Sequence, residues 1–155
     1  MRSAILTMSV ALALVAAQQN PGARKSPHPD VGPGRIAWFD ITTTDLAKSK
    51  EFYGKLFDWK YEEIEGADGL QYTAIGVGET NGHGTGGGML KQMMPGAPSA
   101  WMPYVLVDDI QAATKKARSL GATILKDVTE VPDMGSLCIL KDPTGAVIGL
   151  WQTRM

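Results

Sequence analysis

The chain has 155 residues, of which 44% are apolar, and its formal net charge is −1 at pH 7. This length and composition predict one ordinary globular domain, large enough to bury roughly two-thirds of its unfolded surface without a metal ion or a disulfide to support the fold. The balanced charge gives no electrostatic reason to expect nucleic acid or an acidic membrane surface as a partner.

Residues 1–18 have the pattern of a cleaved secretory signal peptide. The positive residue Arg2 precedes an apolar stretch from Ala4 to Ala17, which ends in the small residues expected at a cleavage position. This stretch is too short to span a bilayer comfortably, so we expect no stable membrane anchor and a periplasmic or extracellular location. An uncleaved anchor, or a start codon placed too early, is the alternative.

Residues 19–34 are dense in Pro and Gly and are predicted to form a disordered linker. The linker contains His28, one of only two histidines in the chain, to which we assign no chemistry. The single cysteine, Cys138, lies in the apolar stretch SLCIL and is predicted to be a buried, unreactive thiol.

A strand, a capped helix and three further strands are predicted from residue 35 onward. The stretch RIAWFDIT alternates like a strand that is covered on both faces. Asp45 is placed to cap a helix. The apolar stripe of this helix follows spacings of three and four and contains Leu46, Ser49, Tyr53 and Leu56. WKYEEIE, QYTAIGV and TGGGML follow as strand candidates, separated by turns that contain Gly and Asp.

The same order of elements returns about 64 residues later. Asp109 is the predicted helix cap, and Gly121 ends the helix in the left-handed conformation that penalises a Cβ. ATILKDV, GSLCILK and AVIGLWQ are the three strands, with the turn DPTG between the last two. We therefore predict an α+β domain over 35–153, in which two βαβββ modules, at about 35–92 and 100–153, share one curved mixed sheet around a concave cleft.

This duplicated order resembles the vicinal oxygen chelate superfamily, which includes glyoxalase I, extradiol dioxygenases, and the bleomycin- and fosfomycin-resistance proteins. The resemblance rests on DLAKSKEFYGKLFDW in the first module, and on VDDIQAATKKARSLGA and KDPTGAVIGLW in the second. It covers essentially all of residues 34–153 and implies the fold. It indicates little about activity, because this fold hosts unrelated chemistries.

In enzymes of this superfamily, the resemblance implies a divalent metal in the concave face, held by His, Glu or Gln from the first and last strand of each module. The corresponding residues here are Trp38 and about Gly88 in the first module, and Met102 and Gly149 in the second. Gly has no side chain, Trp offers no lone pair, and a Met thioether is a weak ligand. His83, in the loop NGHG, would add at most one ligand. We therefore expect no metal and no other cofactor.

Residues that lie on the same strand face as these metal-ligand positions are expected to line an apolar, aromatic cleft that binds a small molecule. The predicted lining consists of Trp38, Asp40, Tyr72, Met89, Met102, Tyr104, Val147 and Trp151. Asp40 and Tyr104 are the polar groups that would orient a ligand, and they are also weak candidates for acid–base catalysis. Two alternatives stay open: the same side chains fill the concavity as ordinary core, or a shift of one residue turns Phe39 and Ile41 inward instead.

The run GVGETNGHGTGGGML satisfies the G-x-G-x-x-G pattern of dinucleotide-binding loops through Gly82, Gly84 and Gly87. That pattern requires a long helix at its last glycine, and Pro95 follows too soon for one. We interpret the run instead as a mobile loop that gates the cleft and leads into a strand, whose glycines allow another group to approach closely.

Three functions remain open from the sequence. The first is a metal-independent protein that binds a small, partly apolar molecule between the two modules. The second is an enzyme of the same superfamily, a lyase, isomerase or dioxygenase, with an unrecognised metal set or with acid–base chemistry at Asp40. The third is an interaction module in which a homodimer closes the cleft. None of them involves nucleic acid.

Overall fold

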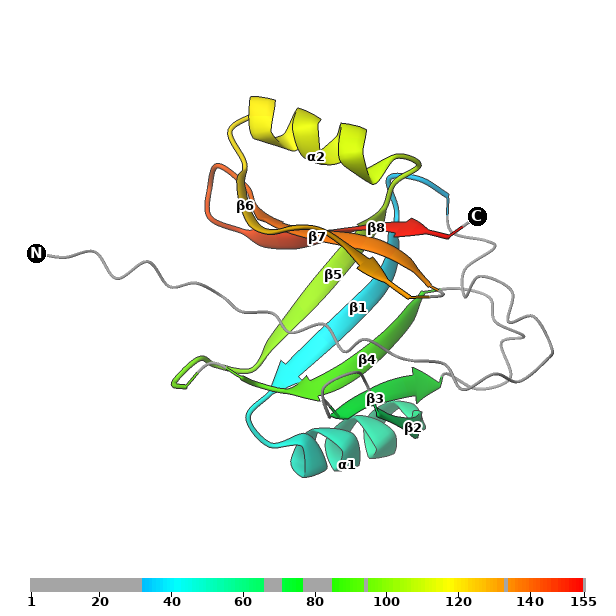
Figure 1. The fold of residues 1–155 in the computed structure, drawn as a ribbon. Coiled ribbons are helices and arrows are strands. Elements are labelled where there is room, and N and C mark those ends of the chain that lie inside the picture. The colour runs from blue at the N-terminus through cyan, green and yellow to red at the C-terminus, as the bar shows by residue number, and fades with distance from the viewer. Residues whose placement is uncertain (1–31, 66–70, 77–84, 94, 133, 155) are drawn as a thin grey trace, which may run out of the picture.

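A computed structural model describes residues 32–65, 71–76, 85–93, 95–132 and 134–154. The predicted signal peptide, most of the predicted linker and His83 lie outside these residues. The described part contains eight strands and two helices (Figure 1). Within it, neither helix has the length and apolar composition needed to cross a membrane.

The first module consists of β1 (Ile36–Thr43), α1 (Leu46–Phe57), β2 (Lys60–Glu65), β3 (Gln71–Gly76) and β4 (Gly86–Lys91). The second module consists of β5 (Ala100–Leu106), α2 (Ile110–Ser119), β6 (Thr123–Val131), β7 (Gly135–Lys141) and β8 (Val147–Thr153). The predicted α+β class and the predicted repeat of strand, helix and three strands are therefore confirmed.

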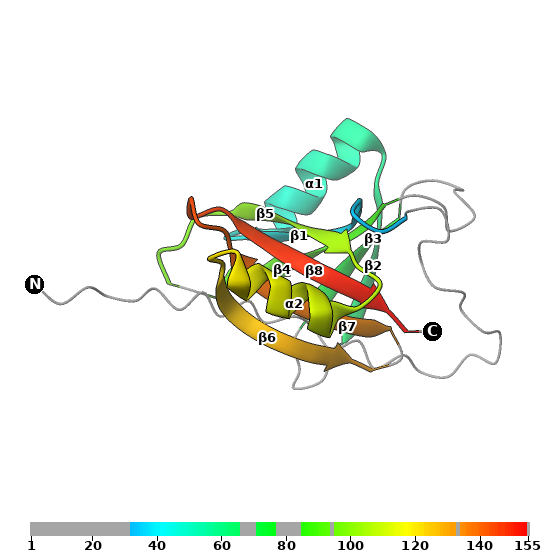
Figure 2. The same cartoon turned by 90° about the horizontal axis from the view of Figure 1, so that it is seen from above.

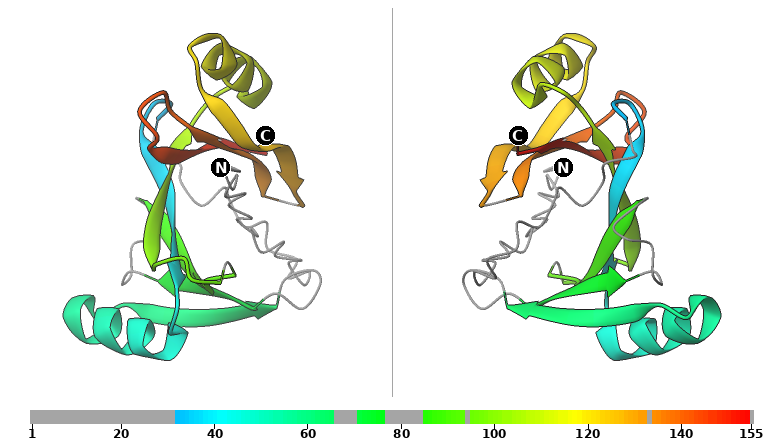
Figure 3. Two further views of the ribbon diagram at one scale, coloured as in Figure 1. Left: turned by 90° about the vertical axis from the view of Figure 1, so that its left-hand side faces the viewer. Right: turned by 90° about the vertical axis from the view of Figure 1, so that its right-hand side faces the viewer.

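The eight strands form one curved sheet in the order β2-β3-β4-β1-β5-β8-β7-β6, whose two ends do not pair with each other. Within each module the first and last strands are parallel, β1 with β4 and β5 with β8, and the two first strands meet antiparallel at the centre. Both helices lie on the outer side of the curve, α1 on the first module and α2 on the second (Figures 2 and 3). The inner, concave side is left to residues from both modules.

Both helices begin at the predicted caps. Asp45 Oδ1 accepts a hydrogen bond from the backbone N–H of Lys48 at 3.0 Å, and Asp109 Oδ1 accepts one from that of Ala112 at 2.9 Å. Each bond satisfies an amide that has no partner within its helix. Gly121 follows α2 with a φ of +92°, which is the left-handed conformation predicted for it.

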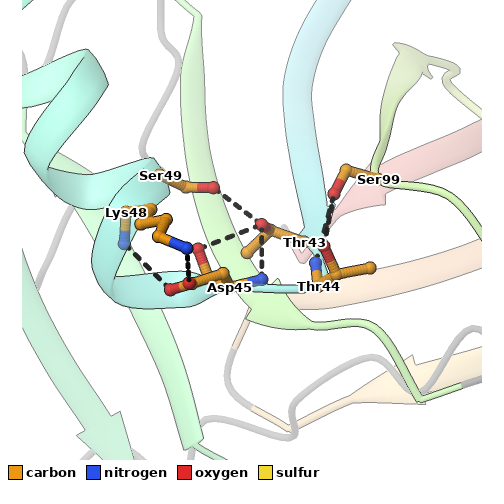
Figure 4. Close-up of polar contacts among 6 residues, drawn as sticks. All are labelled: Thr43, Thr44, Asp45, Lys48, Ser49 and Ser99. Atoms are coloured by element: carbon orange, nitrogen blue, oxygen red, sulfur yellow. Dashed lines mark hydrogen bonds and ion pairs between the residues drawn. The ribbon is translucent and has the colours of Figure 1, made fainter.

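Hydroxyl groups connect the end of β1 to α1 and to the segment between the modules (Figure 4). Thr43 Oγ1 lies 2.6 Å from Ser49 Oγ and accepts a hydrogen bond from the backbone N–H of Asp45 at 3.2 Å. The backbone N–H of Thr44 donates to Ser99 Oγ at 3.1 Å, just before β5 begins. These contacts fix the helix cap relative to the central strands and so direct α1 onto the outer side of the sheet.

The sheet separates two cores. The outer core, beneath α1, contains buried Ile41, Ile75 and Met89, with Phe39 and side chains of α1 packed against them. The inner core contains buried Tyr72, Leu90, Met102, Tyr104, Val131, Leu137, Ile139 and Trp151. Because Phe39 and Ile41 face outward, the even-numbered residues of β1 face inward. The alternative register with Phe39 and Ile41 inward is therefore wrong.

Candidate functional site

Asp40 lies at the centre of the inner face, and none of its surface is exposed. It occupies the middle of β1, opposite Gly88 of β4 and Met102 of β5. The Tyr72 hydroxyl donates a hydrogen bond to Asp40 Oδ1 at 2.7 Å, and the Tyr104 hydroxyl donates one to Oδ2 at 2.9 Å. Because Tyr72 belongs to the first module and Tyr104 to the second, the carboxyl group joins the two modules.

Trp38 completes this polar centre from the same strand as Asp40. Its indole N–H lies 3.1 Å from Asp40 Oδ1 and 3.0 Å from the Tyr72 hydroxyl oxygen, so one donor serves both acceptors. The Trp38 ring also packs against the apolar clusters of both modules. We refer to Trp38, Asp40, Tyr72 and Tyr104 as the Asp40 cluster.

Burial sets the protonation behaviour of the Asp40 cluster. It raises the pKa of the Asp40 carboxyl above its ordinary value, and the hydrogen bonds from Tyr72, Tyr104 and Trp38 oppose that rise without cancelling it. Burial, and then the negative charge of Asp40, raises the pKa of both phenols well above their ordinary value. The tyrosines are therefore neutral hydrogen-bond donors at neutral pH, while the carboxyl group can take up or release a proton in apolar surroundings.

The two glycines at the expected metal-ligand positions make room for the two tyrosines. A Cβ added at Gly88 would lie 2.0 Å from the Tyr72 hydroxyl oxygen, and a Cβ added at Gly149 would lie 2.1 Å from Cδ1 of Tyr104. Gly149 is the strand partner of Tyr104, just as Gly88 is the strand partner of Asp40. The two glycines therefore stand at equivalent places in the two modules.

The residues at the four positions do not fit a divalent metal. Trp38 and Met102 offer no strong ligand, and tyrosine side chains cover both glycine positions. The nearby carboxylate, Asp40, already accepts hydrogen bonds on both oxygens. Across the described ranges, no group of three or more His, Cys, Asp or Glu side chains is arranged to hold a metal ion.

The structure brings seven of the eight expected lining residues together on the inner face. These are Trp38, Asp40, Tyr72, Met102, Tyr104, Val147 and Trp151. The expectation for Met89 is wrong, because its side chain lies in the outer core. Neighbouring residues of a strand point to opposite faces, so Gly88 and Met89 cannot both face inward. Leu90 packs beside Tyr72 instead.

The centre of the inner face is closed by the protein's own side chains, whereas its border is partly open. Asp40, Tyr104 and Met102 are no more than 4% exposed. Partly buried apolar side chains surround them, namely Trp38, Leu106, Leu125, Met134 and Val147. Sequence reasoning misses Leu125 because the pairing of β6 with β7 shifts register twice. In β7 the apolar residues 137–140 are all buried, so GSLCILK contains no alternation that would identify its inward residues, Leu137 and Ile139.

Two other sequence features, the dinucleotide-loop pattern and Cys138, add no group to this site among the described residues. Gly87, the last glycine of the G-x-G-x-x-G pattern, lies within β4, so a strand follows where a dinucleotide site needs a helix. Gly82, Gly84 and the proposed gating loop lie outside the described residues. Cys138 is fully buried on β7, where burial raises the pKa of its thiol, in agreement with the predicted unreactive role.

Residues 35–150 match the Glyoxalase/Bleomycin resistance protein/Dioxygenase superfamily. The chain belongs to this superfamily. Putative glyoxylase CFP32 of Mycobacterium bovis is 34% identical over 127 residues, which cover 78% of this chain and 46% of that protein. Anthracycline biosynthesis protein DnrV of Streptomyces peucetius is 28% identical over 130 residues, covering 77% of this chain and 47% of that protein. The chain therefore spans about half the length of these curated relatives.

Solved structures with the same fold include methylmalonyl-CoA epimerases. The enzyme from Mycobacterium tuberculosis aligns with a TM-score of 0.60 at 13% identity, over 81% of this chain and 92% of its own. The Streptomyces coelicolor enzyme, in complex with 2-nitronate-propionyl-CoA, aligns with a TM-score of 0.61 at 16% identity, over 80% and 100%. At these identities the likeness establishes the fold alone. The resemblance drawn from the sequence is confirmed at the level of superfamily and fold.

Proposed function

We propose that this protein binds a small, partly apolar molecule on the inner face of the sheet, between the two modules, without a metal ion. The Asp40 cluster carries this proposal. It places one carboxyl, two phenols and one indole N–H within an otherwise apolar face. Small-molecule sites have this composition, with apolar walls and a few convergent polar groups that fix orientation.

The ligand would meet the Trp38 ring and the partly open apolar border before it reached the polar centre. Trp38 is held in place through its N–H by Asp40 and Tyr72, so its ring offers a rigid surface for stacking. Asp40 would act mainly by orienting its three donors, because its own surface is covered. The relatives named for anthracycline biosynthesis support a ligand with aromatic character.

Tryptophan fluorescence tests the proposal, since two of the four tryptophans face inward and two face outward. Trp38 and Trp151 belong to the inner core, while Trp59 and Trp101 contact the Phe39 ring on the outer side. Native mass spectrometry of the purified chain would first identify any co-purified molecule and any metal. Titration with that molecule should then quench the wild type and the Trp59→Phe variant, and should quench Trp38→Phe far less. An unchanged quench and affinity in Trp38→Phe would place the ligand elsewhere.

A catalytic role is the second candidate, and the raised pKa of the Asp40 carboxyl favours it. A buried carboxyl with a raised pKa can serve as a general base or acid, as a lyase or an isomerase requires. Asp40→Asn keeps the shape and removes the proton transfer. For an enzyme, this variant should lose about 100-fold or more in turnover while ligand affinity stays the same. Full turnover in Asp40→Asn would exclude Asp40 as the acid–base group.

The proposal also includes secretion of this protein. The composition of residues 1–18 supports removal of this segment during secretion, which would place the binding domain in the periplasm or outside the cell. The intact mass of protein recovered from the exported fraction measures this directly. A mass that includes residues 1–18 would contradict cleavage.

A further inference from the structure

Two lysines of the second module belong to the inner face of the sheet, near its β6 edge. Lys126 of β6 is the strand partner of Ile139, and Lys141 of β7 is the strand partner of Val147. Both Ile139 and Val147 pack in the inner core. Because directly paired residues of neighbouring strands point to the same face of a sheet, both lysines lie on the inner side.

A β-bulge brings Lys126 onto this face. The pairing of β6 with β7 shifts register between Ile124 and Lys126, so β6 has one extra residue there. That residue, Leu125, packs against the inner core. Lys126 follows on the same face, where the regular alternation of a strand would have turned it outward. The next residue, Asp127, lies on the outer side, where it binds Arg118 of α2.

Neither lysine has an anionic partner. Among the described residues, Lys126 and Lys141 take part in no ion pair. The carboxylates that follow them in the sequence are engaged elsewhere, Asp127 with Arg118 and Asp142 with hydroxyl and backbone N–H groups of its own turn. Lys126 is only partly exposed, and burial lowers the pKa of its ammonium group. The fold thus keeps a partly buried cation that an anion from outside can neutralise.

The opposite edge of the sheet has no such surplus of positive charge. Strand β2 corresponds to β6 in the repeat, and its residues Lys60 and Glu62 share the inner face with Ala74. The charges of this lysine and this glutamate balance each other. An acidic group of a ligand is therefore attracted to the edge formed by β6 and β7, which orients the ligand in one direction.

Lys126 stands in the same row across the sheet as Trp38 and Tyr104 of the Asp40 cluster. Successive strand pairings join Trp38 to Tyr104, Tyr104 to Gly149, Gly149 to Ile139, and Ile139 to Lys126. Three strand spacings, about 14 Å along the sheet, therefore separate Tyr104 from Lys126. The Tyr104 ring extends over Gly149, and β6 and β7 curve toward the concave side (Figure 3), so both features shorten the span. A molecule of two or three rings has a matching length.

We propose that Lys126 and Lys141 bind the acidic group of the ligand, which is therefore an aromatic organic acid. This inference rests on the proposed binding site of the inner face and adds the chemical class of its ligand. The rings would lie along the apolar border toward Trp38, while the acidic group would accept charge-assisted hydrogen bonds from the two ammonium groups. Thr123, the other strand partner of Lys141, adds a hydroxyl group at the same edge.

Two fluorescent probes that differ in one charged group test this inference. Anilinonaphthalene sulfonate carries a sulfonate that stands in for the acidic group, and phenylnaphthylamine has the same rings without it. Lys126→Met and Lys141→Met should each raise the dissociation constant of the sulfonate by roughly 10-fold and leave that of the neutral probe unchanged. Lys116→Met, at an exposed position of α2 on the outer side, is the matched control and should bind both probes like the wild type.

The variant Trp38→Phe distinguishes a failure of this inference from a failure of the proposed function. It should weaken both probes, because their rings are the same. If it weakens neither probe while the lysine variants still weaken the sulfonate, the proposed site fails and the two lysines remain an anion-binding site. If it weakens both probes while the lysine variants weaken neither, the proposed site stands and the assignment of the lysines is wrong.

Three results would overturn the inference. The first is a wild type that does not bind the sulfonate. The second is a double variant, Lys126→Met with Lys141→Met, that binds the sulfonate like the wild type or loses both probes equally. The third is a lower urea midpoint for Lys126→Met, which would assign Lys126 to the support of the fold. The midpoint should be no lower than that of the wild type, because the substitution removes a partly buried charge that has no counter-ion.

Discussion

Asp40 exchanges the hydration of its carboxylate for hydrogen bonds from Trp38, Tyr72 and Tyr104. Burial of the charge outweighs those bonds, and the pKa of the carboxyl is raised above its ordinary value. The folded protein therefore binds a proton at Asp40 more tightly than the unfolded chain does. The stability that this residue adds is fully present below the unfolded pKa and is lost as the pH rises through the folded pKa.

The variant Asp40→Asn should remove this pH dependence, because the amide has nearly the same shape and does not ionise. The free energy of unfolding of the wild type, relative to that of the variant, should fall as the pH rises above about 4, the ordinary pKa of an aspartate. Urea denaturation at several pH values measures the difference. Exposed carboxyls with lowered pKa values, such as Asp45 and Asp142, make the free energy of unfolding rise with pH. Their contribution is the same in both proteins and cancels in the difference. A difference that stays constant over this range would contradict the prediction.

Gly149 shows how little space the inner face leaves beside its tyrosines. Because a Cβ at this position would lie 2.1 Å from the Tyr104 ring, Gly149→Ala should destabilise the fold by about 1–3 kcal/mol. Gly76→Ala is the control, since its Cβ would lie 3.6 Å from the nearest atom. Denaturant titration of both variants measures the two costs. Equal costs would mean that the tyrosine ring moves away freely.

Among the elements, α1 ends less favourably than α2. Helix α2 is followed by Gly121 in the left-handed conformation, whereas α1 ends at Asp58 with φ 57° and ψ 24°. A Cβ is penalised in this region, although Asp tolerates it better than most residues.

Substitution of Asp58 should therefore produce a fixed order of stability. Asp58→Gly should raise the free energy of unfolding by about 0.5–1 kcal/mol, and Asp58→Ala should lower it. Thermal and urea unfolding of the two variants beside the wild type give the order directly. A more stable Ala variant would show that the backbone at this turn relaxes out of the left-handed region.

At this scale the sequence predicts the elements well, because local signals determine them. The caps Asp45 and Asp109 and the close approach to the glycines of β4 all follow from short patterns, and the structure confirms them. What the sequence does not reveal depends on contacts between distant segments. Leu56 belongs to the apolar stripe of α1 yet remains 55% exposed, because exposure depends on how the helix lies on the sheet.

The Asp40 cluster shows the same limit at the functional site. The two-residue periodicity of a strand places Trp38 and Asp40 on one face of β1. The internal repeat then places Tyr104 on the same face of the sheet. That Tyr72 reaches over Gly88 to donate to Asp40 depends on the strand order β3-β4-β1, which no local pattern contains.

At the scale of the whole molecule, β1 holds the two modules together. It pairs with β4 of its own module on one side and with β5 of the other module on the other. The Asp40 cluster spans the same junction, since its tyrosines come from β3 and β5. Separation of the modules would expose the inner core and remove the Tyr104 hydrogen bond from Asp40, so neither module is expected to stay folded alone.

The protein should therefore unfold in one cooperative step. Tryptophan fluorescence, which reports on both modules, and far-ultraviolet circular dichroism should give the same midpoint in urea. Two separate transitions would show that one module survives the loss of the other. The same measurement on Tyr104→Phe, which removes one bond across the junction, should show a lower midpoint and still a single step.

The two ends of the domain meet at one corner of the sheet. The backbone N–H of Gly34 donates to the carbonyl oxygen of Leu106 at 2.8 Å, and that of Val107 donates to the carbonyl oxygen of Trp151 at 2.8 Å. A short loop joining these ends, with a new opening between β4 and β5, would exchange the order of the modules along the chain while every strand kept its neighbours. For the same reason, a polypeptide fused before Gly34 or after Thr153 would emerge at the same corner of the sheet, so gene fusion in either order would give similar architectures.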